Sequence, residues 1–408
     1  MINQERLWDK LMQLAHIGKQ VEGGITRLPF TEEDLQAKNL VKEWMQEAGL
    51  QVREDAVGNL VGRKEGTEPS FPAIIIGSHL DTVFNGGMFD GSLGVLAGIE
   101  ILQTMKENLI QTKHPIEVYA FRDEEGCRFN FSLLGSRGVA GNLKPSDLEF
   151  KDRDGITIKE AMKKCHLRPE EFSQAVRNPE EVKAYLELHI EQGKVLECSN
   201  LPVGVVTGIA GSLRLLLTVT GKADHAGATP MNLRADALAG AAQIICMVEQ
   251  EAKESQSAVA TVGRIQAYPG GINIIPGKVE FTIDLRHLSP EVCARLEKNI
   301  LEKANEICKQ RGLDLKVDLM QRVPPAPCSE EIIATILESC DKLDVKTMKL
   351  PSGAGHDAMQ MINISPIGMI FVRSKKGISH HPAEWSSPED CALGANVLME
   401  TVLKLDQM

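Results

Sequence analysis

The sequence predicts an α/β protein in which a smaller, ferredoxin-like domain is inserted into a larger domain. A chain of 408 residues exceeds what one hydrophobic core usually serves, so two domains are expected. Four short apolar runs are each followed at once by turn or polar residues, which is the pattern of buried strands in an α/β sheet. Between about Gly211 and Pro325 the order of elements becomes β-α-β-β-α-β, which is the ferredoxin-like arrangement.

Two helices are expected before the first of these strands. One covers Gln4–His16, and the other ends near Ala48. Thr31 is the expected N-cap of the second helix, and Asp34, three residues on, is the expected acidic partner in a capping-box-like pattern.

The four predicted strands of the larger domain share one property, because each is followed by residues that can do chemistry. They cover Ala73–Gly77, Ile116–Phe121, Tyr185–Leu188 and Ile367–Val372. In open α/β sheets, ligand sites lie outside the carboxyl ends of the strands, so we expect these four ends to converge on one cleft. An apolar helix that begins near Leu93 follows the first strand.

The inserted domain is predicted to contain four strands and two helices. In order, these are strand Leu213–Thr220, helix Ala235–Glu254, strands Ala258–Gln266 and Lys278–Leu285, helix Pro290–Arg311 and strand Leu313–Leu319. Because candidate site residues lie on both sides of it in the sequence, we interpret this domain as an insertion. The expected boundaries are 1–210 and 326–408 for the two parts of the larger domain and 211–325 for the inserted domain.

Composition excludes several classes of partner. There are 45 basic and 56 acidic residues, a formal net charge of −11, and no run of lysine and arginine, so nucleic acid is not expected to bind. The apolar runs are far shorter than a membrane span and the amino terminus opens with charges, which predicts a cytoplasmic protein without a membrane partner. The nine cysteines lack paired C-x-x-C spacing and are expected to be reduced thiols.

The residues that follow the four strands are of the types that bind divalent metal ions. They are His79, Asp81 and Asp90 after the first strand, Asp123, Glu124 and Glu125 after the second, His189 and Glu191 after the third, and His380 and His381 after the fourth. Zinc, manganese and cobalt sites use imidazole and carboxylate ligands. A single histidine of this kind is more often a loop or core residue than a ligand. Their joint occurrence at four separate strand ends therefore predicts a metal site.

Several sequence strings also carry a family resemblance that spans nearly the whole chain. They are SHLDTV, GGMFDGSLGVLAG, DEEG, ELHIEQG, ADHAGATPM, GGINIIP, SGAGHDAM and SHHPAEW. With these strings the chain resembles the amidase branch of the M20 metallopeptidase family, which includes N-carbamoyl-L-amino acid hydrolases and allantoate amidohydrolases. The HIEQG and PAEW strings separate this branch from the ordinary peptidases. The resemblance implies a mixed-sheet, aminopeptidase-like catalytic domain and a homodimer formed through the inserted domain.

The resemblance implies a two-metal site in the larger domain. Asp90 would bridge two divalent ions, which would be zinc, manganese or cobalt. The other ligands would be His79 and His189 for one ion and Glu125 and His380 for the other. Two cations lower the pKa of a water that lies between them, which suits hydrolysis.

Two acids beside these ligands would have other roles. Glu124 would be the general base, which takes the proton of the water and later delivers it to the leaving nitrogen. Asp81, two residues after His79, would accept the other ring N–H of that histidine and fix its tautomer. The alternative for Asp81 is a simple loop cap.

The resemblance also implies roles in substrate binding. His225 would reach the active site of the neighbouring subunit and stabilise the tetrahedral oxyanion. Asn273 and Arg286 would bind the carboxylate of the substrate, which an arginine fork matches in a bidentate manner. The alternative for Arg286 is a surface residue that ends a strand. Gln192, within HIEQG, is a candidate to bind the ureido group of a small ureido acid.

Arg214 determines which substrate is predicted. By resemblance, allantoate amidohydrolases carry arginine here, whereas N-carbamoyl-amino acid hydrolases tend to carry a bulky aromatic residue. The predicted reaction is therefore cleavage of a ureido C–N bond of allantoate, with release of ammonia and carbon dioxide. The alternatives are an N-carbamoyl-L-amino acid hydrolase, an M20 aminopeptidase or deacylase, and a non-catalytic ligand-binding relative. Arg214 could also point to solvent instead of a substrate.

Overall fold

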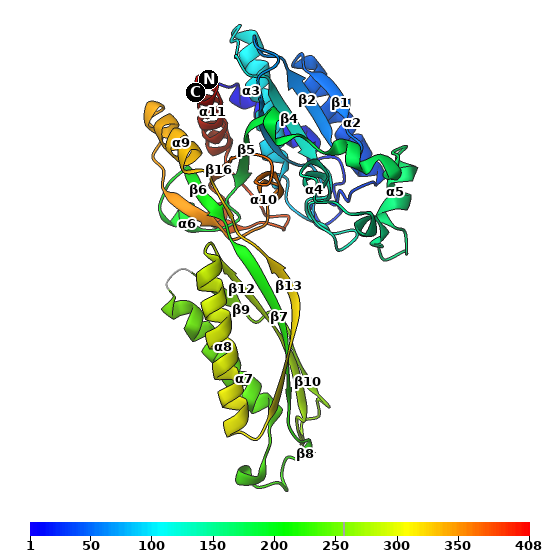
Figure 1. Ribbon diagram of the computed structural model, residues 1–408, viewed down its shortest axis with the longest axis vertical. Coiled ribbons are helices and arrows are strands. Elements are labelled where there is room, and N and C mark those ends of the chain that lie inside the picture. Colours follow the sequence, from blue (N-terminus) through cyan, green and yellow to red (C-terminus); the bar gives the residue numbers. More distant parts are fainter. Residues whose placement is uncertain (256–257) are drawn as a thin grey trace. The chain divides into compact units, whose positions relative to one another are not determined.

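The chain folds into two units in the computed structural model, which describes residues 1–255 and 258–408 (Figure 1). The main unit consists of Met1–Gly208 and Pro327–Met408, and the inserted unit consists of Ile209–Ala326. The predicted α/β fold class is confirmed, because both units combine helices with a sheet. Within the described residues, no helix is both long enough and apolar enough to cross a membrane.

A nine-stranded mixed sheet forms the centre of the main unit. The order across the sheet is β1-β2-β4-β3-β5-β16-β6-β14, and β15 also pairs with β6. The strands are β1 (Gln51–Glu54), β2 (Leu60–Lys64), β3 (Ala73–His79), β4 (Ile116–Phe121), β5 (Val182–Ile190), β6 (Val203–Ile209), β14 (Ala326–Pro327), β15 (Lys349–Ser352) and β16 (Ile367–Val372).

Four neighbouring strands of this sheet, β4, β3, β5 and β16, are parallel to one another. They contain the four strands predicted from the sequence, and β4 and β16 have the predicted bounds. Every residue of β3, β4 and β16 is buried, which explains why these segments are continuously apolar. Because the strands are parallel, their carboxyl ends lie at the same edge of the sheet.

The main unit also contains helices. They are α1 (Gln4–Leu14), α2 (Glu32–Glu47), α3 (Ser92–Glu107), α4 (Leu134–Val139), α5 (Ile158–Lys164), α6 (Val195–Cys198), α9 (Glu330–Lys342), α10 (Ala358–Met361) and α11 (Pro388–Leu405). Of these, α2, α3, α4, α9, α10 and α11 contact strands of this sheet. Thirteen of the sixteen residues of α3 are buried, as expected for a helix that is apolar nearly all round. It packs against β3 and β5, so it holds the loop before it close to the carboxyl ends of these strands.

The start of α2 differs in one detail from the predicted capping box. The side chain of Thr31 accepts the N–H of Asp34, as expected for an N-cap. The Asp34 carboxylate, however, accepts the N–H of Phe30 at 2.7 Å instead of that of Thr31. Asp34 also forms a buried ion pair with Arg122, which draws its short side chain away from the cap position.

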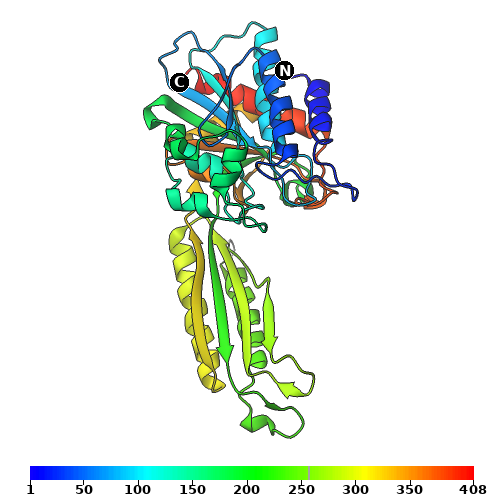
Figure 2. The same ribbon diagram turned by 90° about the vertical axis from the view of Figure 1, so that its right-hand side faces the viewer.

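The inserted unit has the predicted ferredoxin-like topology. Its elements are β7 (Gly211–Thr220), β8 (Asp224–His225), α7 (Ala237–Glu254), β9 (Val259–Thr261), β10 (Ile265–Tyr268), β11 (Ile274–Ile275), β12 (Lys278–His287), α8 (Pro290–Gln310) and β13 (Asp314–Val323). The main strands lie in the antiparallel order β10-β12-β7-β13, with β7, β12 and β13 side by side (Figure 2). β8 and β11 form a separate two-stranded sheet.

The strand predicted over 258–266 is instead two short strands. Both β9 and β10 pair with β12, and the chain between them contains Gly263. A glycine has no side chain to pack on a sheet, which favours an interruption at this point.

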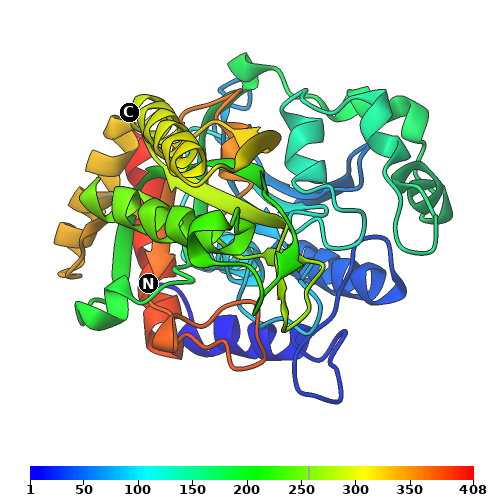
Figure 3. The same cartoon turned by 90° about the horizontal axis from the view of Figure 1, so that it is seen from below.

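The core of the inserted unit lies between its sheet and its two helices. Alternate residues of β7 and β12 are buried there, namely Leu213, Leu215, Leu217, Val219, Val279, Phe281, Ile283 and Leu285. α7 and α8 pack against each other and against these strands (Figure 3). The remaining residues of β7 and β12, which include Arg214, Asp284 and Arg286, therefore lie on the other face of the sheet.

Candidate metal centre

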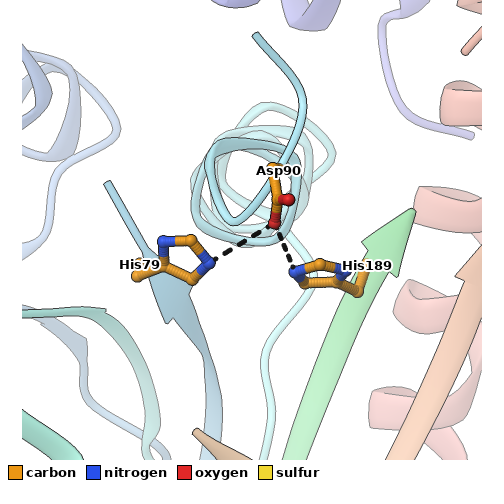
Figure 4. A group of neighbouring side chains, drawn as sticks. All are labelled: His79, Asp90 and His189. Carbon is orange, nitrogen blue, oxygen red and sulfur yellow. Dashed lines mark ion pairs between the residues drawn. The ribbon is translucent and has the colours of Figure 1, made fainter. Parts of the chain in front are cut away.

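One buried carboxylate, that of Asp90, lies at the carboxyl edge of the parallel strands. Its Oδ1 is 3.1 Å from Nε2 of His189, which is on β5, and 3.6 Å from Nε2 of His79, which ends β3. Figure 4 shows the two imidazole rings on either side of this oxygen. Its Oδ2 is 3.3 Å from Nε2 of His380, and that nitrogen is 3.4 Å from Oε1 of Glu125.

The structure thus brings all five predicted metal ligands into one cluster. They make up two groups of possible ligands, His79, Asp90 and His189, and Asp90, Glu125 and His380, while Glu124 lies outside both and forms another group with His79 and Glu125. In each group the ligand atoms lie within 4.8 Å of one another. Asp90 is common to both groups and turns a different oxygen to each. Imidazole and carboxylate donors in this arrangement fit two divalent cations that share a carboxylate.

A glycine makes the approach of His79 to Asp90 possible. Gly91 has a positive φ of 64°, and a Cβ there would lie 2.5 Å from the ring of His79. α3 begins directly after this glycine. Only glycine tolerates both the backbone conformation and the close approach of the ring.

The two buried histidines have their tautomers fixed by main-chain carbonyl groups. Nδ1 of His189 is 2.9 Å from the carbonyl oxygen of Ile190, and Nδ1 of His79 is 3.0 Å from that of Asp81. In the neutral rings Nδ1 therefore carries the proton, and Nε2 presents its lone pair towards Asp90, as a metal ligand must.

The role expected of the Asp81 carboxylate differs from what the structure shows. Its Oδ1 is 3.7 Å from Nδ1 of His79, so the main-chain carbonyl of Asp81 makes the closer contact. The carboxylate oxygens accept the main-chain N–H groups of Glu124 and Glu125, each at 3.1 Å. These two N–H groups hold the carboxylate at the turn after β4, and Asp81 in return positions the neighbouring acids.

Glu124 lies beside the cluster in a buried position. Its Oε2 is 3.9 Å from Nε2 of His79, and the residue is 8% exposed. Burial raises the pKa of Glu124 well above its usual range, and Glu125 adds to this effect while His79 opposes it. A carboxylate with a raised pKa is a better proton acceptor, which suits a general base.

The pKa of Asp90 is shifted in the opposite direction from that of Glu124. Burial opposes the ionisation of Asp90, but when no cation is bound the rings of His189, His380 and His79 can be protonated on both nitrogens, and hydrogen bonds from these protonated rings hold the pKa of Asp90 well below its usual range. The two neighbouring carboxyl groups are thus given different properties by their surroundings, one suited to binding cations and the other to carrying a proton.

Gln192 also contacts the cluster. Its Nε2 donates to Oδ2 of Asp90 at 2.9 Å, and its backbone is in the left-handed region with φ 58°. Within the described residues, its Oε1 is buried and has no hydrogen-bond partner. The side chain thus offers one acceptor at the cluster for an N–H group of a ligand.

Two residues at the cluster were not singled out by the sequence analysis. The Ser379 hydroxyl donates to Oδ2 of Asp90 at 2.9 Å, and Glu384 accepts the main-chain N–H of Asp90 at 3.1 Å. Both belong to the string SHHPAEW, in which attention went to the histidines. The string alone does not reveal these contacts, because the partners of Glu384 are main-chain N–H groups of a loop far away in the sequence.

His225 and Asn273 lie in the inserted unit and adjoin each other there. Nδ1 of His225 accepts N–H groups from Gly227 at 3.0 Å and Ala228 at 3.1 Å. The main-chain carbonyl of Asn273 accepts the N–H of Ala226 at 2.9 Å, which joins the two segments beside the β8–β11 pair. Since Nδ1 is an acceptor, the neutral ring of His225 carries its proton on Nε2, where it can be donated.

Arg214 and Arg286 share one acid, which the sequence analysis did not foresee. Nε and Nη2 of Arg286 each contact Asp284 at 2.9 Å. Nε of Arg214 contacts the same carboxylate at 3.0 Å, and its Nη1 donates to Gln321 at 2.9 Å. Each expected substrate-binding arginine is thus engaged within its own sheet.

The two pairs of expected substrate residues are far apart within the inserted unit. Arg286 pairs with Ser212 at one end of the β7–β12 ladder, and Lys278 pairs with Thr220 at the other, next to the β8–β11 pair. Arg286 lies eight positions along the strand from Lys278, which is about 26 Å. The structure does not bring His225 and Asn273 together with Arg286 in one chain.

Comparisons with known proteins agree on the family. The profile described as Peptidase family M20/M25/M40 matches residues 75–404. The chain is 54% identical over 407 residues to the N-carbamoyl-L-amino acid amidohydrolase of Geobacillus stearothermophilus, covering 100% of both chains. It is 37% identical to the allantoate amidohydrolase of Bacillus subtilis, covering 97% of this chain and 96% of the relative. Among solved structures it is similar to an amidase of the hydantoinase/carbamoylase family from Burkholderia multivorans, with a TM-score of 0.95, 34% identity and coverage of 100% and 98%.

Proposed function

Because the chain belongs to the peptidase family M20/M25/M40, and within it to the amidase branch, we propose that it hydrolyses N-carbamoyl-L-amino acids with two divalent metal ions. The chain is a hydrolase of C–N bonds other than peptide bonds. The observation that carries the mechanism is the Asp90 carboxylate between two groups of ligands, with the buried acid Glu124 beside them.

The choice of substrate revises the prediction made from the sequence. Allantoate was predicted on the strength of Arg214 alone, and this arginine contacts Asp284 just as Arg286 does, so its contacts do not separate the two substrates. The relative at 54% identity is named an N-carbamoyl-L-amino acid amidohydrolase, whereas the allantoate amidohydrolase is at 37%. These findings support N-carbamoyl-L-amino acids over allantoate as the substrate class.

The metal ions of this proposal are zinc, manganese or cobalt, because all three accept imidazole and carboxylate ligands. His79 and His189 would hold one ion and Glu125 and His380 the other, with Asp90 shared by both. When bound, such a pair of cations polarises a carbonyl oxygen and lowers the pKa of a water.

The residues of the chain then account for proton transfer and charge stabilisation. Glu124 takes a proton from the attacking water and delivers it to the nitrogen that leaves the carbamoyl carbon. Nε2–H of His225 donates to the oxyanion that forms at this carbon. Hydrolysis of the ureido group consumes one water and yields the amino acid, ammonia and carbon dioxide. Arg286 and Asn273 pair with the substrate carboxylate, and Gln192 accepts an N–H of the ureido group.

We propose that two chains complete each site. A small ureido acid cannot span the roughly 26 Å of strand that separates Arg286 from the β8–β11 pair, so in this proposal His225 and Asn273 of one chain act together with Arg286 of the other. Apolar side chains near this pair are exposed, with Ile272 at 104%, Met231 at 78% and Leu233 at 69%. Such a patch favours a protein–protein contact, which supports a homodimer through the inserted unit.

The substrate proposal makes a direct kinetic prediction. After loading with Mn²⁺ or Zn²⁺, the enzyme is expected to hydrolyse N-carbamoyl-L-leucine with a kcat/KM at least about tenfold above that for allantoate, which is about 1.4 kcal/mol in transition-state binding. Ammonia release in a steady-state assay measures both. A higher kcat/KM for allantoate would reverse the ranking of substrates and leave the metal site untouched.

The dimer proposal predicts complementation between two inactive variants. Glu124→Gln lacks the base and His225→Ala lacks the oxyanion donor, so a mixed dimer contains one site with both groups intact. Mixing the two is expected to recover up to about one quarter of wild-type activity, because half of randomly formed dimers are mixed and each has one repaired site. Mass spectrometry verifies subunit exchange. No recovery despite complete exchange would mean that His225 acts within its own chain.

A further inference from the structure

A buried glutamate joins the loop that carries Asp90 to the loop that carries His380. Oε1 of Glu384 accepts the main-chain N–H groups of Phe89 at 2.9 Å and Asp90 at 3.1 Å. Its Oε2 is 2.8 Å from the hydroxyl of Ser379, the residue directly before His380. Glu384 is 2% exposed, and it lies 294 residues from Asp90 in the sequence. One carboxylate thus fixes the spacing of two distant segments.

We call the contacts of Glu384 with Phe89, Asp90 and Ser379 the Glu384 junction; its Ser379 hydroxyl contacts Oδ2 of Asp90 and not Oδ1. Oδ1 faces His189 and His79. Oδ2 faces His380 at 3.3 Å and also accepts the hydroxyl of Ser379 at 2.9 Å. Because Ser379 contacts both Glu384 and Oδ2, a change at Glu384 reaches the His380 side of the cluster first.

Glu384 lies in closely packed surroundings. A Cβ on Gly87 would lie 2.1 Å from the carboxyl group of Glu384, so a glycine is required at this point of the Asp90 loop. The rings of Phe89 and Trp385, which flank the junction in sequence, pack edge to face with centroids 5.7 Å apart. Trp8 of α1 contacts both rings.

The backbone of His380 makes such a restraint necessary. Its φ is 55°, in the left-handed region that non-glycine residues rarely adopt. A residue in this conformation keeps its place only when its surroundings hold it there. Ser379 and Glu384, on either side of His380 in sequence, supply hydrogen bonds to the Asp90 loop that do so.

We propose that Glu384 is a positioning residue that sets the affinity of the metal position formed by Oδ2 of Asp90, Glu125 and His380. This inference rests on the proposed two-metal function. Glu384 belongs to none of the groups of potential metal ligands found among the described residues, so it acts through Asp90 and Ser379. Hydrogen-bonded partners of this kind orient metal ligands, and their loss costs about 10- to 100-fold in metal affinity.

The hydrogen bonds also predict which substitution is tolerated. Glutamine at this position keeps an oxygen that accepts the N–H groups of Phe89 and Asp90. Its amide N–H can donate to Ser379, whose single hydroxyl proton then goes to Asp90. Glu384→Gln therefore preserves the junction, whereas Glu384→Ala removes it.

Titration of the metal-free protein with Co²⁺, followed by the visible absorption of bound cobalt, tests this inference without any assay of activity. Wild type is expected to bind two ions per chain. In Glu384→Ala one of the two dissociation constants should rise by about 10- to 100-fold, while Glu384→Gln should remain near wild type. In crystals of Glu384→Ala at limiting Co²⁺, anomalous scattering should appear beside His79 and His189 alone.

Two further variants separate positioning from loss of fold. Ser379→Ala keeps the main-chain bonds of Glu384 and cuts only its link to Oδ2, so it should weaken the same position even where Glu384→Ala folds poorly. Asp406→Ala removes another buried carboxylate that accepts a distant main-chain N–H, that of His114, at 2.8 Å. This control should lower the melting temperature and leave both Co²⁺ affinities unchanged.

The Co²⁺ titrations distinguish failure of the proposed two-metal function from failure of the inference about Glu384. Wild type that binds fewer than two ions would contradict the proposed function itself. If wild type binds two ions and Ser379→Ala and the folded Glu384→Ala bind them equally well, the inference about Glu384 is wrong. The inference would also be wrong if Glu384→Gln and Glu384→Ala weakened Co²⁺ binding equally. The negative charge of Glu384, and not its hydrogen bonds, would then set the affinity.

Discussion

Replacing Asp90 with asparagine is expected to abolish measurable turnover. The amide is neutral and offers a single carbonyl oxygen, so it cannot serve two cations from two oxygens as the carboxylate can. We expect metal content to fall from two ions per chain to at most one, and kcat to fall by about 10³-fold or more, which is about 4 kcal/mol. Elemental analysis of the dialysed protein and an ammonia-release assay measure the two effects.

The matched control for this prediction is Asp406→Asn. Asp406 is also buried and also accepts a main-chain N–H, but that N–H belongs to His114, near the amino end of β4 and away from the carboxyl edge of the sheet. The Asp406→Asn variant should keep two metal ions and a near-normal kcat. Asp90→Asn with two tightly bound ions and ordinary turnover would show that Asp90 is not shared between them.

Glu124→Gln is the second substitution with a large expected effect. Glutamine keeps the size of the side chain but cannot accept the proton of the attacking water. We expect kcat to fall by about 10²-fold or more, with KM changed little and both metal ions retained. Steady-state kinetics and metal analysis of the same sample are needed together, because the prediction is a loss of turnover without a loss of metal.

The adjacent acid provides the control for this result. Glu125 lies 3.4 Å from Nε2 of His380, whereas Glu124 lies 3.9 Å from Nε2 of His79. Glu125→Gln should therefore lose metal along with activity. If Glu124→Gln lost metal in proportion to its activity, Glu124 would be a ligand and another group would have to act as the base.

The fold of the main unit was predictable where strands are buried on both faces. β4 and β16 have the predicted bounds because a parallel strand with no exposed residue reads as one continuous apolar run. The sequence also indicates that polar residues follow these strands, and parallel pairing brings them to one edge. Short, exposed strands such as β1, which has no buried residue, carry no such signal.

Other details depended on contacts that a sequence does not contain. The pairing of Asp284 with Arg214 follows from the register of β12 on β7, which brings these two residues opposite each other. Likewise, the orientation of His79 depends on the carbonyl group of Asp81, and every residue supplies a carbonyl whatever its side chain. Glu384 was missed because its partners are the main-chain N–H groups of a loop almost three hundred residues away.

The substrate was the weakest point of the prediction for a related reason. Preference for allantoate rested on the identity of a single residue, Arg214, whose side chain proves to be 45% exposed and bound to Asp284 and Gln321. An arginine on the open face of a sheet is readily satisfied by neighbouring strands, so its presence alone does not indicate a ligand.

The most direct test of two cations sharing Asp90 is an anomalous-diffraction map of crystals grown with Mn²⁺ or Zn²⁺. The account predicts two peaks roughly 3.5 to 4 Å apart, one beside His79 and His189 and the other beside Glu125 and His380, with Asp90 between them. A single peak, or two peaks of which only one contacts Asp90, would contradict it.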